Sequence, residues 1–120
     1  MSTNPVVAVM DDLFFTVKIL DAAKRAGMAV EFVKSEIDAI DKARNAPALM
    51  ILDLNCAAID PLRLITALKA DPETKYVNLL GYISHVQGDL KLKAQQAGCD
   101  MVLARSAFSQ NLHQLLKRYA

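Results

Sequence analysis

Residues 50–55 read MILDLN, a short apolar run that ends in an aspartate and an asparagine. The run suits a buried strand, yet it delivers the carboxyl group of Asp53 at its end. Because an isolated buried carboxylate is costly, such a group is normally solvated, paired with a cation or bound to a metal. The segments on either side of this run indicate which of these applies.

The composition of the chain is typical of one compact domain. The chain has 120 residues, of which 53% are hydrophobic and 22% are charged. With a net charge of +1 and no basic cluster beyond the dipeptide KR, a nucleic-acid surface is not expected. No signal peptide is recognisable, and no apolar run approaches the roughly 20 residues that span a bilayer, so we expect a cytoplasmic protein without a membrane contact. Cys56 and Cys99 fit neither a disulfide framework nor a zinc site and are expected to pack as small residues.

Five apolar runs alternate along the chain with five segments of helical pattern. Strands are expected at 5–10, 28–34, 48–53, 77–84 and 100–104, and helices at 13–27, 35–45, 60–70, 88–98 and over the apolar stripe of residues 108–119. Gly27 is a natural helix end, Ser35 with Asp38 resembles a capping box, and Asp60-Pro61 predicts a helix start. This alternation indicates an open parallel sheet with helices on both faces.

Polar side chains follow four of the expected strands. Where parallel strands end, they meet at one edge of the sheet, and ligands bind beyond that edge. Three carboxylates, a hydroxyl and a cation are expected to converge there: Asp11, Asp12, Asp53, Ser84 and Arg105. Clustered carboxylates repel one another, and a hard divalent cation such as Mg²⁺, Mn²⁺ or Ca²⁺ relieves that repulsion. No glycine-rich phosphate loop is present, which disfavours the nucleotide folds built on such loops.

These motifs occur in a known order. The acidic pair in VMDDL, the aspartate in ILDLN, the hydroxyl in GYISH and the cation in VLARS are similar in order and approximate spacing to those of response-regulator receiver domains. The chain resembles this family over essentially its whole length. The resemblance implies that residues 1–120 form a single receiver-like domain with the flavodoxin-like (βα)5 fold, a doubly wound five-stranded parallel sheet.

The resemblance also implies roles for the acidic residues. Asp53 would be the phosphoacceptor, and Asp12 and Asp53 would bind Mg²⁺ directly. Asp11 would act through water, and the backbone carbonyl of Asn55 would be a further ligand. The phosphoryl group would come from a histidine kinase, a phosphotransfer protein or a small phosphodonor, and the effect would pass to a downstream protein target. Such a domain is not an enzyme beyond self-catalysed phosphoryl transfer.

The remaining site residues include departures from the family pattern. Ser84 would hold a phosphoryl oxygen, whereas Arg105 stands where the family has a lysine, and a planar guanidinium is not equivalent to an ammonium. Ser106 stands where the family has a proline, so a different path is expected for the loop there. Val102 replaces the switch aromatic, which removes ring rotation as a signal. His85 follows Ser84, where it could crowd the acceptor, offer a proton or simply lie partly exposed in the loop.

Alternative interpretations remain open. Asp11 or Asp12 could cap the first helix. Arg105 could pair with the acids, which would give a pseudo-receiver, a protein-interaction module that is independent of phosphorylation. A magnesium-dependent phosphatase is disfavoured, because Asn55 stands where that chemistry needs a second acid. Phe14 and Val17 fall on the polar side of their helix, where they would form a contact surface for a kinase helix or a homodimer unless a loop covers Phe14.

Overall fold

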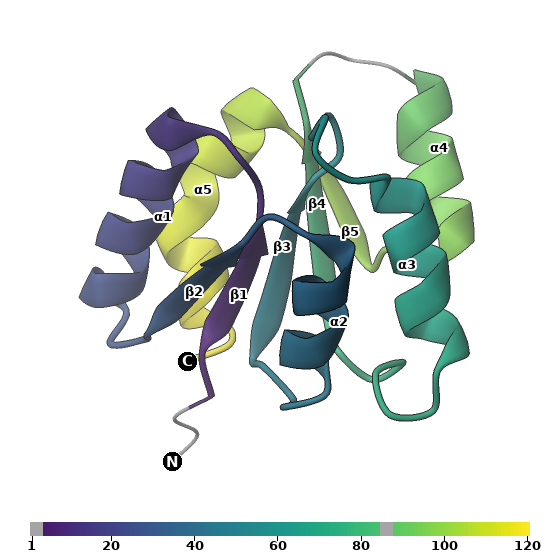
Figure 1. The fold of residues 1–120 in the computed structure, drawn as a ribbon. Coiled ribbons are helices and arrows are strands. Elements are labelled where there is room, and N and C mark those ends of the chain that lie inside the picture. Colours follow the sequence, from purple (N-terminus) through teal and green to yellow (C-terminus); the bar gives the residue numbers. More distant parts are fainter. Residues whose placement is uncertain (1–3, 85–87) are drawn as a thin grey trace.

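The computed structural model describes residues 4–84 and 88–120, which form one sheet of five parallel strands with helices on both faces (Figure 1). The strands are β1 (Val6–Val9), β2 (Val30–Val33), β3 (Leu49–Asp53), β4 (Leu79–Ile83) and β5 (Met101–Ala104). They lie in the order β2-β1-β3-β4-β5, and each neighbouring pair is parallel. The predicted doubly wound α/β fold is therefore confirmed.

The helices divide between the two faces of the sheet. They are α1 (Leu13–Arg25), α2 (Glu36–Ala43), α3 (Pro61–Ala70), α4 (Gly88–Ala97) and α5 (Arg105–Lys117). Helices α1 and α5 cover one face, and α2, α3 and α4 cover the other (Figure 1). Among the described residues, no helix is both long enough and apolar enough to cross a bilayer.

Each face of the sheet has its own apolar core, and β3 contributes to both. Leu49 and Ile51 pack with α1 and α5, whereas Met50 and Leu52 pack on the α2–α4 side. Because successive side chains of a strand point to opposite faces, Asp53 follows Ile51 onto the α1–α5 face. The side chain of Asp53, the candidate phosphoacceptor, therefore projects from the sheet on the same side as the large aromatic residues of that core.

The helix starts and ends follow the predicted signals. Asp12 caps α1, the Ser35 hydroxyl accepts a bond of 3.1 Å from the third residue of its helix, and Asp60 caps α3. Gly27 has a positive φ of 73°, as expected for a glycine after a helix. Helix α5 differs, because Ala104 at its cap position provides no side-chain hydrogen bond.

Differences from the predicted boundaries are small except at the start of α5. Individual strand ends differ from the expected ones by at most two residues, and α2 stops at Ala43 rather than near residue 45. Helix α5 begins at Arg105, immediately after β5, so Ser106 lies in its first turn and no separate loop follows the strand. No cis peptide bond occurs within residues 4–84 and 88–120.

Candidate functional site

The carboxyl edge of the sheet brings the predicted site residues into two neighbouring clefts. Asp11, Asp12, Asp53 and Asn55 line a cleft of about 500 Å³. The second cleft, of about 540 Å³, is lined by Phe14, Phe15, Ser84, Ala104, Arg105, Ser106 and Ser109. Phe14 lines both clefts, so the two hollows adjoin at the first turn of α1. His85 lies outside the described residues.

Asp12 has two tasks at the start of α1. Its Oδ1 atom accepts hydrogen bonds from the backbone N–H groups of Phe14 at 2.9 Å and Phe15 at 3.4 Å. Its Oδ2 atom lies 3.1 Å from Nη2 of Arg105. The capping role weighed for the acidic pair is therefore confirmed for Asp12, and the same carboxylate is also neutralised by a cation. A metal ion bound to Oδ2 would repel the Arg105 guanidinium, because both are positively charged. The ion would therefore either share the Asp12 carboxylate with Arg105 or displace Arg105 from it.

The Arg105 guanidinium lies over aromatic rings as well as beside Asp12. Its central carbon is 4.8 Å from the ring centroid of Phe15 and 5.8 Å from that of Phe14. A planar cation over an aromatic face gains electrostatic attraction in addition to its ion pair. The pairing of Arg105 with an acid, one of the two interpretations of this residue, is thus present, and the stacking holds the side chain across the start of α1.

Asp53 carries the least compensated charge at this edge. The residue is half-buried, and its Oδ1 atom accepts a 2.9 Å hydrogen bond from the backbone N–H of Asn55. Burial raises the pKa of Asp53 above its usual value, the Asp12 charge raises it further, and the Asn55 bond and Arg105 oppose the shift. Within the described ranges, no lysine or arginine forms an ion pair with Asp53. Asp11, in contrast, lies 3.4 Å from Lys34 in an exposed pair.

Asn55 has a side-chain role that the sequence did not predict. Its Oδ1 atom accepts a 2.8 Å hydrogen bond from the backbone N–H of Ser84. This bond ties the turn after β3 to the end of β4, and so fixes Ser84 relative to Asp53. Sequence reasoning considered only the backbone carbonyl of Asn55, and an exposed asparagine after a strand gave no further signal.

The oxygen atoms that line the first cleft are of the type that binds a hard cation, although they do not converge on one metal position. Carboxylate and carbonyl oxygens from Asp12, Asp53 and Asn55 are the type that Mg²⁺ prefers. In the part of the chain that the structure describes, no three His, Cys, Asp or Glu side chains are grouped closely enough to hold a metal. Instead, Asp11 forms an ion pair with Lys34, and Asp12 forms one with Arg105. The magnesium ligand set from the sequence remains a prediction.

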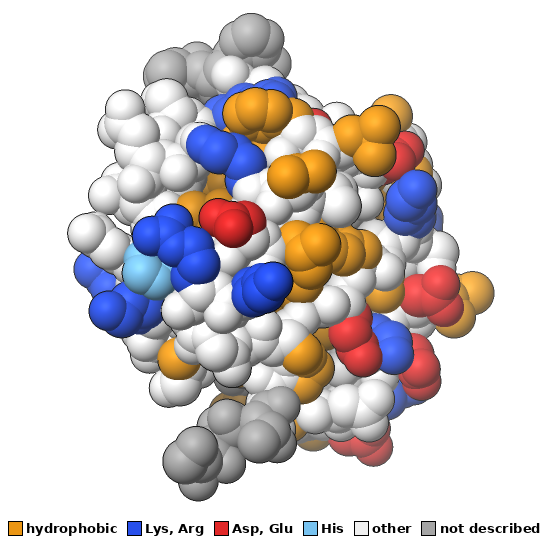
Figure 2. Space-filling view, turned by 90° about the vertical axis from the view of Figure 1, so that its left-hand side faces the viewer, with side chains coloured by type: hydrophobic (Ala, Val, Ile, Leu, Met, Phe, Trp, Pro, Cys, Tyr) orange, Lys and Arg blue, Asp and Glu red, His pale blue; other side chains and the backbone are white. Residues whose placement is uncertain are grey.

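An apolar strip lies on the outside of α1, next to the site. It consists of Leu13, Phe14, Val17 and Leu20, whose exposed fractions range from 53% to 84%. Figure 2 shows apolar side chains along this face with lysine and arginine side chains beside them. The predicted exposure of Phe14 and Val17 is confirmed. Cys56 and Cys99 are buried, as expected for packing residues, and Val102 is buried as well.

Comparison with known proteins gives structural matches without sequence matches. No protein-family model matches the sequence, and no curated protein is significantly similar to it. Among solved structures, the chemotaxis response regulator CheY4 of Vibrio cholerae has a TM-score of 0.82 at 19% identity, covering 99% of this chain and 100% of that chain. A response regulator from Hahella chejuensis has a TM-score of 0.85 at 17% identity, covering 97% and 94%.

A third match is the receiver domain of sensor histidine kinase PA1611 from Pseudomonas aeruginosa, with a magnesium ion coordinated in its active-site cleft. Its TM-score is 0.81 at 20% identity, and the match covers 98% of each chain. All three matches span almost the entire chain, and the strand order and the acidic carboxyl edge agree with the predicted resemblance. The chain therefore has the fold of response-regulator receiver domains.

Proposed function

We propose that this chain is a receiver domain in two-component signalling, and that Asp53 accepts a phosphoryl group in a Mg²⁺-dependent reaction. The observation that carries this proposal is the state of Asp53: a half-buried carboxylate at the end of β3, beside Asp12, with a raised pKa and no ion pair to a described cation. An uncompensated carboxylate in an open cleft suits a site that is completed by an external cation and a phosphoryl group.

The chemistry follows from the residues around the acceptor. A carboxylate oxygen of Asp53 attacks the phosphorus of the donor, and the bond from phosphorus to the leaving group breaks with its electron pair. Asn55 holds Oδ1 of Asp53 during this step through its backbone N–H. The Ser84 hydroxyl would donate to a phosphoryl oxygen, and Arg105 would pair with another. The phosphoryl group ends as an acyl phosphate on the Asp53 side chain, and the donor leaves without it.

The residues expected to hold Mg²⁺ are Asp12, Asp53 and the backbone carbonyl of Asn55, with Asp11 acting through water. Bound there, the ion would neutralise charge on the oxygens of the transferred group. The magnesium ion in the structurally similar PA1611 receiver supports this assignment. Arg105 would then exchange its contact with Asp12 for one with the phosphoryl group.

The phosphodonor is expected to be a histidine kinase or a phosphotransfer protein, and it must reach Asp53 across the start of α1. Leu13 and Phe14 line the cleft that contains Asp53, so a protein that delivers a phosphoryl group would cover them. Their large exposed apolar surface suits such a contact. A homodimer through the same strip is the alternative occupant, and a downstream protein target would respond to the phosphorylated state.

A second candidate function is favoured by the contacts of Arg105. The ion pair with Asp12 and the stack on Phe15 hold the Arg105 guanidinium at the site in the absence of phosphate, as a pseudo-receiver would require. Such a protein would act as an interaction module whose state is independent of phosphorylation.

Beryllofluoride, a phosphoryl mimic, separates the two functions. With Mg²⁺ present, we expect NMR signals of the loops after β3 and β4 to shift in the wild type and not in Asp53→Ala. Arg105→Lys should preserve or strengthen binding, because a compact ammonium reaches the mimic without leaving an aromatic stack. No binding by a folded wild type would favour the pseudo-receiver.

A further inference from the structure

Tyr82, in β4, carries a polar atom that the resting structure leaves without a partner. The residue is 1% exposed, and its hydroxyl is the one buried side-chain polar atom among the described residues that has no hydrogen bond. A buried tyrosine hydroxyl normally finds a partner, because losing its bonds to water without replacement costs stability. Phenylalanine would fill the same space without that cost. The hydroxyl therefore marks this position as more than packing.

The ring of Tyr82 is held in a fixed direction. It stacks on Phe108 with ring centroids 4.7 Å apart and an angle of 3° between the planes. The ring of Phe15 lies 4.8 Å away between centroids, tilted by 42°. Both neighbours are fully buried, so the three rings pack against one another in one core and restrain the direction of the Tyr82 ring. The hydroxyl is consequently a preoriented donor.

This donor lies next to the acceptor in the sheet. Tyr82 is the register partner of Asp53 between the parallel strands β3 and β4, and both residues face the α1–α5 side. Burial raises the pKa of Tyr82 far above its usual value, and the charges of Asp53 and Asp12 raise it further. The register pairing and the shared face place the Tyr82 and Asp53 side chains as neighbours at the carboxyl end of the sheet.

We propose that Tyr82 is a positioning residue of the acceptor site, and that its hydroxyl donates a hydrogen bond to the Asp53 group once that group carries a phosphoryl group or a phosphoryl mimic. This inference rests on the proposed acceptor role of Asp53. Phosphorylation adds negative charge and strong acceptor oxygens to Asp53. These oxygens would give the buried, unpartnered hydroxyl of Tyr82 an acceptor for its hydrogen bond. The contacts with Phe15 and Phe108 limit the freedom of the ring, so little side-chain entropy is lost when the bond forms.

The test compares Tyr82→Phe with Tyr76→Phe, which removes the same hydroxyl from a residue that is 80% exposed. Beryllofluoride affinity in the presence of Mg²⁺ and the melting temperature are measured for the wild type and both variants. We expect Tyr82→Phe to bind the mimic about tenfold more weakly, since a hydrogen bond to a charged group is lost. We also expect it to melt at the same temperature as the wild type or higher, because the unpartnered hydroxyl is gone. Tyr76→Phe should change neither quantity.

The outcomes distinguish this inference from the proposed function. A purely structural residue would not combine weaker mimic binding with equal or greater stability. Equal affinity in Tyr82→Phe and the wild type would overturn the inference alone. A clearly lower melting temperature of Tyr82→Phe would also overturn it, since the hydroxyl would then have a partner in the resting fold. A wild type that does not bind the mimic would overturn both the inference and the acceptor role of Asp53.

Discussion

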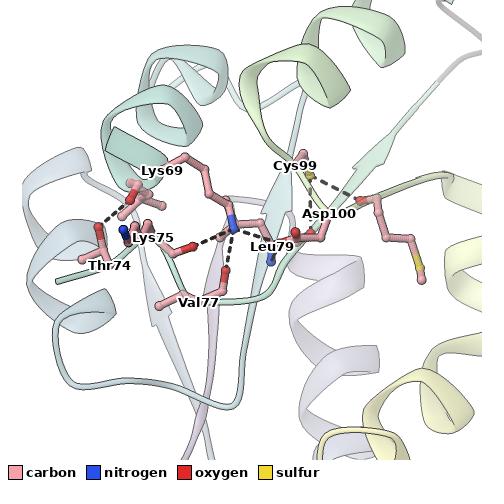
Figure 3. A network of polar contacts seen from close by, with 9 residues as sticks. Lys69, Thr74, Lys75, Val77, Leu79, Cys99 and Asp100 are labelled. Carbon is pink, nitrogen blue, oxygen red and sulfur yellow. Dashed lines mark hydrogen bonds and ion pairs between the residues drawn. The ribbon is translucent and has the colours of Figure 1, made fainter. Parts of the chain in front are cut away.

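At the amino ends of β4 and β5, Lys69 and Asp100 bind each other and the surrounding backbone (Figure 3), whereas the acids at the opposite end of the sheet outnumber the cations that pair with them. Lys69 donates to the carbonyls of Val77 at 3.0 Å and Lys75 at 3.2 Å, and to Oδ2 of Asp100 at 3.1 Å. The same oxygen of Asp100 accepts a 2.8 Å bond from the N–H of Leu79. This amino-end network joins α3, the segment before β4 and the turn before β5.

The carboxyl edge is arranged differently. Three acids lie there, and two of them pair with described cations, Asp11 with Lys34 and Asp12 with Arg105. Asp53 has a raised pKa. The difference indicates that the amino-end network stabilises the fold. At the carboxyl edge, by contrast, the acids keep negative charge that a bound cation would neutralise. Variants at the two ends should therefore differ in the size and in the sign of their effects on stability.

The largest effect is expected at the amino end. Lys69→Met should lower the free energy of unfolding by about 2 kcal/mol, because it leaves Asp100 and two carbonyls without their common donor. Lys75→Met is the matched control: its side chain is exposed, and the change should stay within about 0.5 kcal/mol. Urea unfolding at neutral pH measures both. Equal stability of Lys69→Met and Lys75→Met would remove the amino-end network as a stabilising feature.

A smaller effect on stability, with a specific loss of binding, is expected for Asp12→Ala. Loss of the α1 cap should cost about 1 kcal/mol, and magnesium binding should disappear with the carboxylate. Asp21→Ala, on the exposed side of the same helix, should leave both properties unchanged. An NMR titration with Mg²⁺ checks the binding. Wild-type binding that survives in Asp12→Ala, or no wild-type binding, would argue against the metal site.

The smallest effect, of opposite sign, is expected for Asp53→Asn. Because the pKa of Asp53 is raised in the fold, the folded state takes up a proton at higher pH than the unfolded state does. Ionisation of Asp53 therefore reduces stability as the pH rises through its folded pKa. Replacing it with neutral asparagine should make the protein equally or more stable at neutral pH, and the gain should shrink as the pH falls through that pKa.

Urea unfolding of the wild type and Asp53→Asn across the acidic range tests this sign. A variant that is less stable than the wild type at neutral pH would mean that the Asp53 charge stabilises the fold. In that case the contrast between the two ends of the sheet would not hold.

The sequence predicted those parts of the site that depend on topology. Once the strands are parallel, the residues that follow them must meet at one edge, so the positions of Asp12, Asp53, Ser84 and Arg105 followed from the strand ends alone. The helix caps were predictable as well, because a cap such as Asp60 acts on residues close to it in sequence.

The features that the sequence missed depend on the directions of side chains from distant segments. The bond from Ser84 to Asn55 spans 29 residues, and the ion pair of Lys69 with Asp100 spans 31. The stacking of Tyr82 on Phe108 joins a strand to a helix of the same core. Nothing in the apolar pattern around Tyr82 distinguishes a hydroxyl without a partner from one that is satisfied.

The central claim, that Asp53 accepts a phosphoryl group, is tested most directly by intact-mass measurement after incubation with acetyl phosphate and Mg²⁺. The wild type should gain the mass of one phosphoryl group. Asp53→Asn should gain none, and removal of Mg²⁺ with a chelator should prevent the gain in the wild type. An unchanged wild-type mass, or an equal gain in Asp53→Asn, would contradict the claim.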